Sequence, residues 1–153
     1  MIPMAFDASV AGLVDAHDTW HKAATAPLES IRPDAFSPVY FDCCMTEAVS
    51  AVARRFHEKQ RIPEFHQLIE ELSTRVSPAM ITWILPDVPR LYTDILEFTR
   101  SWSGELNFND SLIALACRER SIDAIASFDH DFDRVVWVRR ASSPSEVQAL
   151  LAA

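Results

Sequence analysis

Four acidic residues spread along the chain stand where their carboxylates could act together. Two of them follow or end apolar segments, at residues 3–6 and 124–128, and the other two stand in the first turns of segments with helical apolar spacing. The carboxyl ends of parallel strands meet at one edge of a sheet, where ligands bind, so we expect the four side chains to converge there. They are Asp7, Glu47, Asp110 and Asp129.

The surroundings of these acids indicate a divalent metal ion rather than isolated buried charges. Asp110 precedes Leu112, Ile113 and Leu115 in a helix with little polar surface, and an unpaired carboxylate buried beside such a helix is costly. A bound Mg²⁺ or Mn²⁺ would remove that cost, because it takes oxygen ligands and keeps waters that can attack a phosphodiester. Taken singly, Glu47 and Asp110 could instead be ordinary acids that complement helix dipoles.

Short apolar segments alternate with segments of helical spacing along the chain. This alternation predicts an α/β fold with a mostly parallel sheet and helices on both faces. Ser143 and Glu146 have the spacing of a capping box, and Pro144 suits the first helical position. We expect strands at residues 3–6, 38–41, 81–85, 124–128 and 135–138, and helices at 9–15, 18–29 and 110–120 and from residues 46, 63, 89 and 144.

The length and composition predict a single globular domain over residues 1–153. The chain is 49% hydrophobic and 24% charged, which suits a protein with a buried core. Its two glycines do not form a phosphate-binding loop, and its three cysteines suit buried thiols in a reducing compartment. No apolar run reaches membrane-helix length and no secretory signal is evident, so we expect a cytoplasmic protein without a membrane partner. We expect Trp83, Trp102 and Trp137 in the core.

The segments around the four acids form an ordered set of motifs. Residues 5–9 (AFDAS) place an aspartate after an apolar strand and a hydroxyl residue two positions later, and residues 46–49 (TEAV) place a glutamate in a helix. Residues 106–114 (LNFNDSLIA) and 125–133 (IASFDHDFD) place the other two aspartates. In this order the segments resemble the PIN-domain family, particularly the VapC-like toxins of type II toxin–antitoxin systems.

The resemblance implies a PIN-like α/β/α sandwich, divalent-metal-dependent cleavage of RNA, frequent dimerisation and, for toxin members, a cognate antitoxin that blocks the site. Carried over residue by residue, it makes the four acids ligands of Mg²⁺ or Mn²⁺, with Asp42 as the alternative to Glu47. It makes Ser9 and Ser127 hydroxyls that orient the ligands, with Asp131 as a further acid. The family commonly has threonine where Ser127 stands.

The chain carries a net charge of −8, which is the wrong sign for binding RNA through overall charge. Arg54 and Arg55 could hold RNA phosphates locally, or they could form a solvated face paired with Glu58 and Glu64. The apolar stripes of the helices that start at residues 46 and 63 could form a homodimer face or cover the sheet. We therefore predict a metal-dependent endoribonuclease, the toxin of a type II toxin–antitoxin pair.

Two other functions are compatible with an α/β domain of this kind. A catalytically silent PIN-like module would bind RNA or a protein partner and would lose no function when Asp7 or Asp110 became asparagine. A phosphatase or receiver-like domain built around Asp7 generally needs a neighbouring acid and a late lysine. Asp7 has no acidic neighbour and no lysine follows Lys59, so the sequence disfavours this second alternative.

Overall fold

The computed structural model describes residues 1–8 and 35–152 of the chain, and the strands there form one sheet. All of its strand pairs are parallel, and the strand order is β3-β2-β1-β4-β5. The expected parallel sheet is therefore confirmed, whereas the helices expected at residues 9–15 and 18–29 lie outside the described residues. The strands are β1 (Ile2–Phe6), β2 (Phe36–Phe41), β3 (Ile81–Thr82), β4 (Ala124–Ala126) and β5 (Arg139–Ala141).

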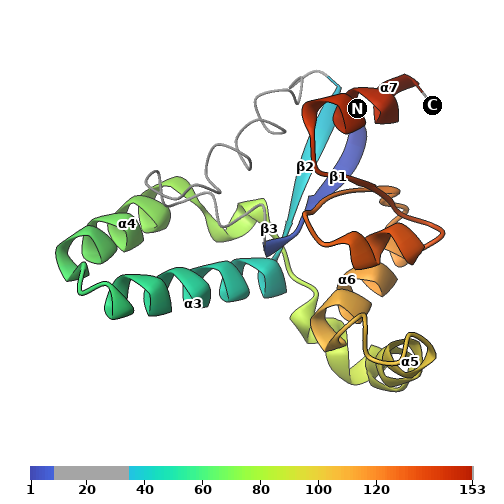
Figure 1. Cartoon of the computed structure of the whole chain (residues 1–153), viewed down its shortest axis with the longest axis horizontal. Helices are drawn as coiled ribbons and strands as arrows, with labels where there is room; N and C mark the ends of the chain where they lie inside the picture. Colours follow the sequence, from blue (N-terminus) through green and yellow to red (C-terminus); the bar gives the residue numbers. More distant parts are fainter. Residues whose placement is uncertain (9–34, 153) are drawn as a thin grey trace.

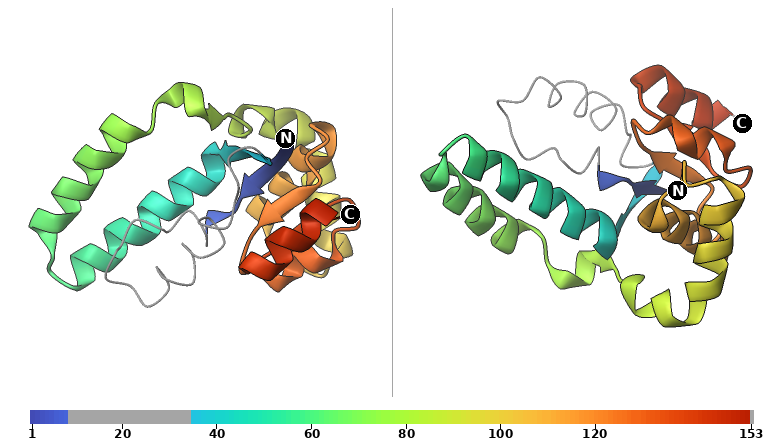
Figure 2. Two further views of the ribbon diagram at one scale, coloured as in Figure 1. Left: turned by 90° about the horizontal axis from the view of Figure 1, so that it is seen from above. Right: turned by 60° about the horizontal axis from the view of Figure 1, so that its bottom comes forward.

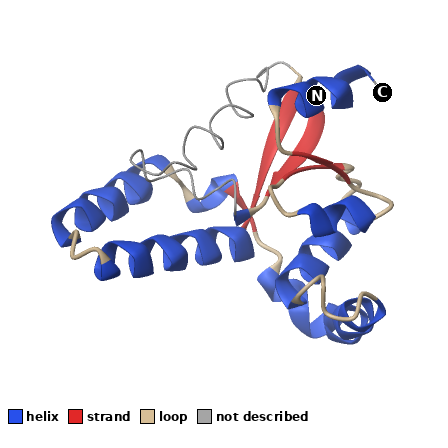
Figure 3. Cartoon of the chain, in the orientation of Figure 1, coloured by secondary structure: helices blue, strands red, loops and turns tan. Residues whose placement is uncertain are grey.

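Helices lie on both sides of this sheet (Figure 3). None of the helices in the described part of the chain is long and apolar enough to cross a membrane. The α-helices are α3 (Asp42–Glu58), α4 (Ile62–Arg75), α5 (Val88–Ser101), α6 (Phe108–Glu119) and α7 (Pro144–Ala152), and the short 3-10 helices are η1 (Pro78–Met80), η2 (Leu85–Asp87) and η3 (His130–Arg134).

The two faces of the sheet bury separate apolar clusters. Ala5 of β1 belongs to the cluster that includes Leu91 of α5 and Leu112 of α6. Its neighbour Met4 belongs to the cluster that includes Val147 of α7. Successive residues of a strand point to opposite faces, so α5 and α6 cover one face and α7 covers the other, as Figure 2 shows.

Helices α3 and α4 form an arm that extends away from the sheet (Figure 1). They run side by side and bury a small cluster of their own, made of Val52, Phe56 and Leu68. Their apolar stripes therefore pack largely against each other. The expectation that these stripes simply cover the sheet is wrong, because the stripe of α4 meets α3 instead.

Two strands differ in position from their sequence-based expectation. A strand was expected at residues 135–138, but those residues form a turn and β5 begins at Arg139. Val135 and Val138 are buried as loop residues, so their apolar pattern reflects core packing and not a strand. Likewise β3 ends at Thr82, and the chain turns into η2.

Two further corrections follow from local geometry. Helix α3 begins at Asp42, four residues before the expected start, and the Asp42 carboxylate accepts the Cys43 N–H at the first turn. Trp83 is 54% exposed instead of buried, because β3 stops before it reaches this residue. Its indole N–H donates to the carbonyl of Pro78 at 3.3 Å.

Candidate active site

The direction of the chain across the sheet reverses between β1 and β4. From β1 the strand order runs through β2 to β3, and after β3 the chain returns to the other side of β1 as β4 and continues to β5. The crevice outside such a reversal is the usual ligand site of an open parallel sheet. Asp7 directly follows β1, and Ser127 and Asp129 follow β4, so three of the predicted residues lie at the carboxyl ends of the two strands that flank this reversal.

Ser127 connects the two strand-end aspartates. Its hydroxyl donates to Asp7 Oδ2 at 2.8 Å and accepts the backbone N–H of Asp129 at 3.0 Å. The Asp7 carboxylate also accepts the N–H of Ala8 through Oδ1 at 2.7 Å. Ser127 is fully buried and Asp7 is nearly so, so this connection holds the two strand ends in a defined geometry.

Asp110 enters the site from the first turn of α6. Asn107 is the N-cap of that helix, and its side chain accepts the Asp110 N–H at 3.0 Å. In the reciprocal hydrogen bond, the Asp110 carboxylate accepts the backbone N–H of Asn107 through Oδ2 at 3.2 Å. This capping box satisfies two helix-end donors and orients a carboxylate that is only 8% exposed.

The pKa of Asp110 reflects its burial and the charges of the other predicted acids. Burial raises the pKa of the Asp110 carboxyl, and the hydrogen bond from the Asn107 backbone N–H opposes this rise. The negative charges of Asp7, Asp129 and Glu47 raise the pKa further, to about 6. Glu47 is exposed on α3. The pKa of the free Cys44 thiol is raised mainly by its side-chain hydrogen bond with Cys43 and by burial. The charges of Asp7 and Glu47 add to this rise.

Asp42, the alternative to Glu47, serves the fold. Its carboxylate accepts the N–H of Ile84 through Oδ1 at 3.0 Å and the N–H of Leu85 through Oδ2 at 3.0 Å. Asp42 is 2% exposed, and these bonds join the start of α3 to the turn that enters η2. A carboxylate whose oxygens both accept buried backbone donors is poorly placed to bind a cation, so the structure favours Glu47 over Asp42.

The loop after Asp129 contributes backbone and side-chain contacts. The Asp129 carboxylate accepts the N–H of Asp131 through Oδ1 at 2.9 Å, so Asp131 orients Asp129 through its backbone. Asp133 is bound side-on by Arg140, which keeps the pKa of that carboxyl below its usual range, with a smaller contribution from His130. Arg140 was not identified from the sequence, since its partner lies seven residues away and no motif marks the pair. Ser9 lies outside the described residues.

The donor set suits a hard cation. The four acids supply only oxygen atoms, which Mg²⁺ and Mn²⁺ prefer. The pKa of Asp110 is raised mainly by burial and further by the charges of the other acids, and a bound cation would offset both costs. As the carboxylates stand, no three His, Cys, Asp or Glu side chains within residues 1–8 and 35–152 are close enough to enclose an ion.

The predicted RNA-binding residues lie farther along α3. Arg54 is exposed and Arg55 is half-buried. Seven residues separate Glu47 from Arg54, which is nearly two helical turns, so the two side chains share a helix face about 10 Å apart along the axis. Arg55 lies about 100° around the helix from that face.

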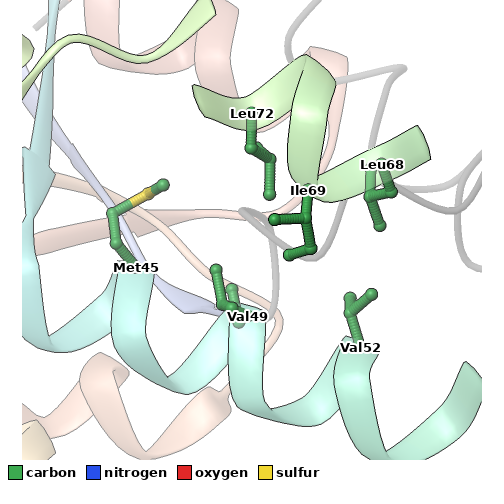
Figure 4. Close-up of a pocket in the computed structure, with 7 residues that line it drawn as sticks. Met45, Val49, Val52, Leu68, Ile69 and Leu72 are labelled. Atoms are coloured by element: carbon green, nitrogen blue, oxygen red, sulfur yellow. The ribbon is translucent and has the colours of Figure 1, made fainter. Parts of the chain in front are cut away.

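An apolar cleft lies between α3 and α4, on the arm. Figure 4 shows side chains of both helices pointing toward one another across it. An adjoining cleft of about 480 Å³ continues toward Val76 and Ile81. The labelled residues are Met45, Val49, Val52, Leu68, Ile69 and Leu72. Val52 and Leu68 are buried between the two helices, so a homodimer face here would consist of the partly exposed Met45, Val49, Ile69 and Leu72.

The parallel sheet with helices on both faces defines a PIN-like α/β/α fold. The crystal structure of FitAcB from Neisseria gonorrhoeae matches this chain with a TM-score of 0.66, over 93% of this chain and 98% of that chain, at 18% sequence identity. No family model and no curated protein matches the sequence. The likeness therefore supports the fold.

Proposed function

We propose that this protein is a divalent-metal-dependent endoribonuclease. The observation that supports the proposal is the connection of Asp7 to Asp129 through Ser127 at the reversal point of the sheet. Asp110 lies within range of the charges of Asp7, Asp129 and Glu47, which add to the rise of its pKa. This is the arrangement that the resemblance to the PIN-domain family implies. The structural likeness to FitAcB supports the same fold.

Asp7, Glu47, Asp110 and Asp129 would hold Mg²⁺ or Mn²⁺. Such an ion supplies a nucleophilic water at neutral pH and stabilises charge on the oxygens of an in-line phosphoryl displacement. The chain's own residues prepare the site. Ser127 and the Asn107 capping box orient carboxylates, and Arg54 on the Glu47 face of α3 would bind a neighbouring phosphate of the RNA.

A toxin role and its partners belong to the same proposal. The motifs resemble those of VapC-like toxins, for which a cognate antitoxin blocks the acidic site. The apolar cleft of the α3–α4 arm supports a protein contact, and we assign it to a homodimer. Expression of the protein should arrest bacterial growth, and the Asp110→Asn variant should not.

Cleavage of a mixed RNA pool tests the activity. We expect cutting with Mg²⁺ or Mn²⁺, none with EDTA, and a loss of at least about 100-fold in the Asp110→Asn variant, since removal of a metal ligand disables a metal-activated water. Asp94→Asn is the matched control, because Asp94 is exposed on α5. A folded protein that cuts no RNA under any of these conditions, purified without a bound inhibitor, would instead be a binding module.

A further inference from the structure

Arg140 is a buried cation at the edge of the sheet. Its side chain is 4% exposed, whereas the side chain of its neighbour Arg139 is 39% exposed. Both residues belong to β5, the edge strand beside β4. A guanidinium withdrawn from water is unfavourable unless it is paired and hydrogen-bonded, so the contacts of Arg140 explain why it is there.

Those contacts join the loop after β4 to the end of β4 itself. Arg140 binds Asp133 side-on, with Nε donating to Oδ1 at 2.7 Å and Nη2 donating to Oδ2 at 3.2 Å. Its Nη1 donates to the backbone carbonyl of Ser127 at 2.9 Å. Nη2 also lies 3.0 Å from Nδ1 of His130. One planar group thus holds both ends of the segment from Ser127 to Asp133.

The acidic site depends on the geometry of that segment. The Ser127 hydroxyl contacts the Asp7 carboxylate and the Asp129 backbone, and Asp129 in turn accepts the Asp131 N–H. We propose that Arg140 is a positioning residue of the acidic site, which sets the separation of Asp7 and Asp129 by holding the Ser127 backbone and η3 together. This inference rests on the proposed function, because it concerns the same four acids.

The requirement is for arginine rather than for positive charge. The guanidinium has a rigid fork of donors that can bind a carboxylate side-on and still reach a carbonyl with its remaining nitrogen. A lysine ammonium is a compact charge on a flexible stem, so it can replace one of these bonds but not the planar set. The Arg140→Lys variant should therefore fold, but it should not keep the geometry of the site.

The test compares Arg140→Lys and Arg140→Gln with Arg139→Gln as the matched control. Arg139 is the adjacent arginine of the same strand, and it pairs with the exposed Asp123 at 3.0 Å. Three quantities are measured on folded protein: amide hydrogen exchange without metal, affinity for Mn²⁺ alone, and kcat and KM for RNA cleavage. Asp133→Asn, which weakens the same pair from its exposed side, replaces any Arg140 variant that does not fold.

We expect the Arg140 variants to bind Mn²⁺ about 10–100-fold more weakly and to lose a similar factor in kcat, as for other residues that orient metal ligands. KM should change little, and the Asp129 and Asp131 amides should exchange faster. Arg139→Gln should resemble the wild type. Folded Arg140 variants with wild-type exchange and Mn²⁺ affinity would overturn the positioning role. A wild type that cuts no RNA, but whose Mn²⁺ affinity still depends on Arg140, would overturn only the nuclease.

Discussion

At the scale of single residues, hydrogen-bond donors distinguish the roles of acids that look equivalent in the sequence. Asp42 and Glu47 lie on the same helix, and the sequence left open which of them serves the site. The N–H groups of Ile84 and Leu85, which come from a segment more than forty residues away along the chain, donate to the two oxygens of the Asp42 carboxylate. No local pattern reveals such long-range donors, so the choice between two nearby carboxylates required the structure.

Asp110 should make the metal-free protein less stable as the pH rises. Its pKa is about 6 in the folded state and about 3.9 in an unfolded chain. The folded state therefore holds this proton to a higher pH. The stability associated with the proton is complete below pH 4 and is lost as the pH rises through 6, a loss on the order of 2–3 kcal/mol.

Urea unfolding in EDTA from pH 4 to pH 7 measures this effect. The Asp110→Asn variant lacks the titrating group and can still accept the Asn107 N–H through its amide oxygen. Its stability relative to the wild type should therefore increase across this range, while Asp94→Asn should show no such trend. Parallel stability curves for Asp110→Asn and the wild type would contradict the raised pKa.

At the scale of elements, strands that carry charge were harder to place than those that are apolar. β1 and β4 were predicted nearly as observed because their residues form uninterrupted apolar runs that are largely buried. β5 was placed four residues too early, because it begins with Arg139 and Arg140, whose charges are balanced by Asp123 and Asp133. The hydropathy pattern cannot reveal such ion pairs. It placed the strand at the preceding segment instead, which contains the buried Val135 and Val138.

Asp42→Asn should destabilise the junction between α3 and η2. An asparagine amide places a donor where the wild type has a carboxylate oxygen, so either the buried N–H of Ile84 or the partly buried N–H of Leu85 loses its nearest acceptor. An unsatisfied buried donor costs about 1–3 kcal/mol. Urea unfolding at pH 7 should show a loss of that size, against less than about 0.5 kcal/mol for the exposed Asp94→Asn control.

The same variant also tests the assignment of the fourth acid. If Asp42 serves only the fold, folded Asp42→Asn protein should bind Mn²⁺ as the wild type does, whereas Glu47→Gln should bind it more weakly. If only the Asp42→Asn variant bound Mn²⁺ more weakly, the metal-ligand role would belong to Asp42 and not to Glu47.

At the scale of the whole molecule, topology was more predictable than the shape of the arm. Alternating strands and helices were sufficient to predict a parallel sheet, and the strand-end aspartates predicted the edge at which Ser127 connects Asp7 to Asp129. The projection of α3 and α4 was not predictable. A helix stripe that packs on a neighbouring helix has the same spacing as one that packs on a sheet, so Val52 and Leu68 could not indicate which partner they meet.

With an overall charge of −8, the proposed binding of RNA would depend on a few local cations. Arg54 shares a helix face with Glu47, so it should contact a phosphate next to the acidic site. Arg54→Gln, made in the Asp110→Asn background so that RNA stays intact, should weaken RNA binding several-fold. It should also lower the slope of log Kd against log salt concentration by about one, as expected for one lost phosphate contact.

Arg100→Gln is the control for Arg54, because Arg100 is an exposed arginine on α5, at the other end of the described structure from the arm. It removes the same charge from the molecule, so any effect of net charge alone should appear equally in both variants. Equal loss of RNA affinity would show that long-range charge, and not a contact along α3, decides binding. A loss confined to Arg54→Gln would place the RNA along the face of α3 that leads to Glu47.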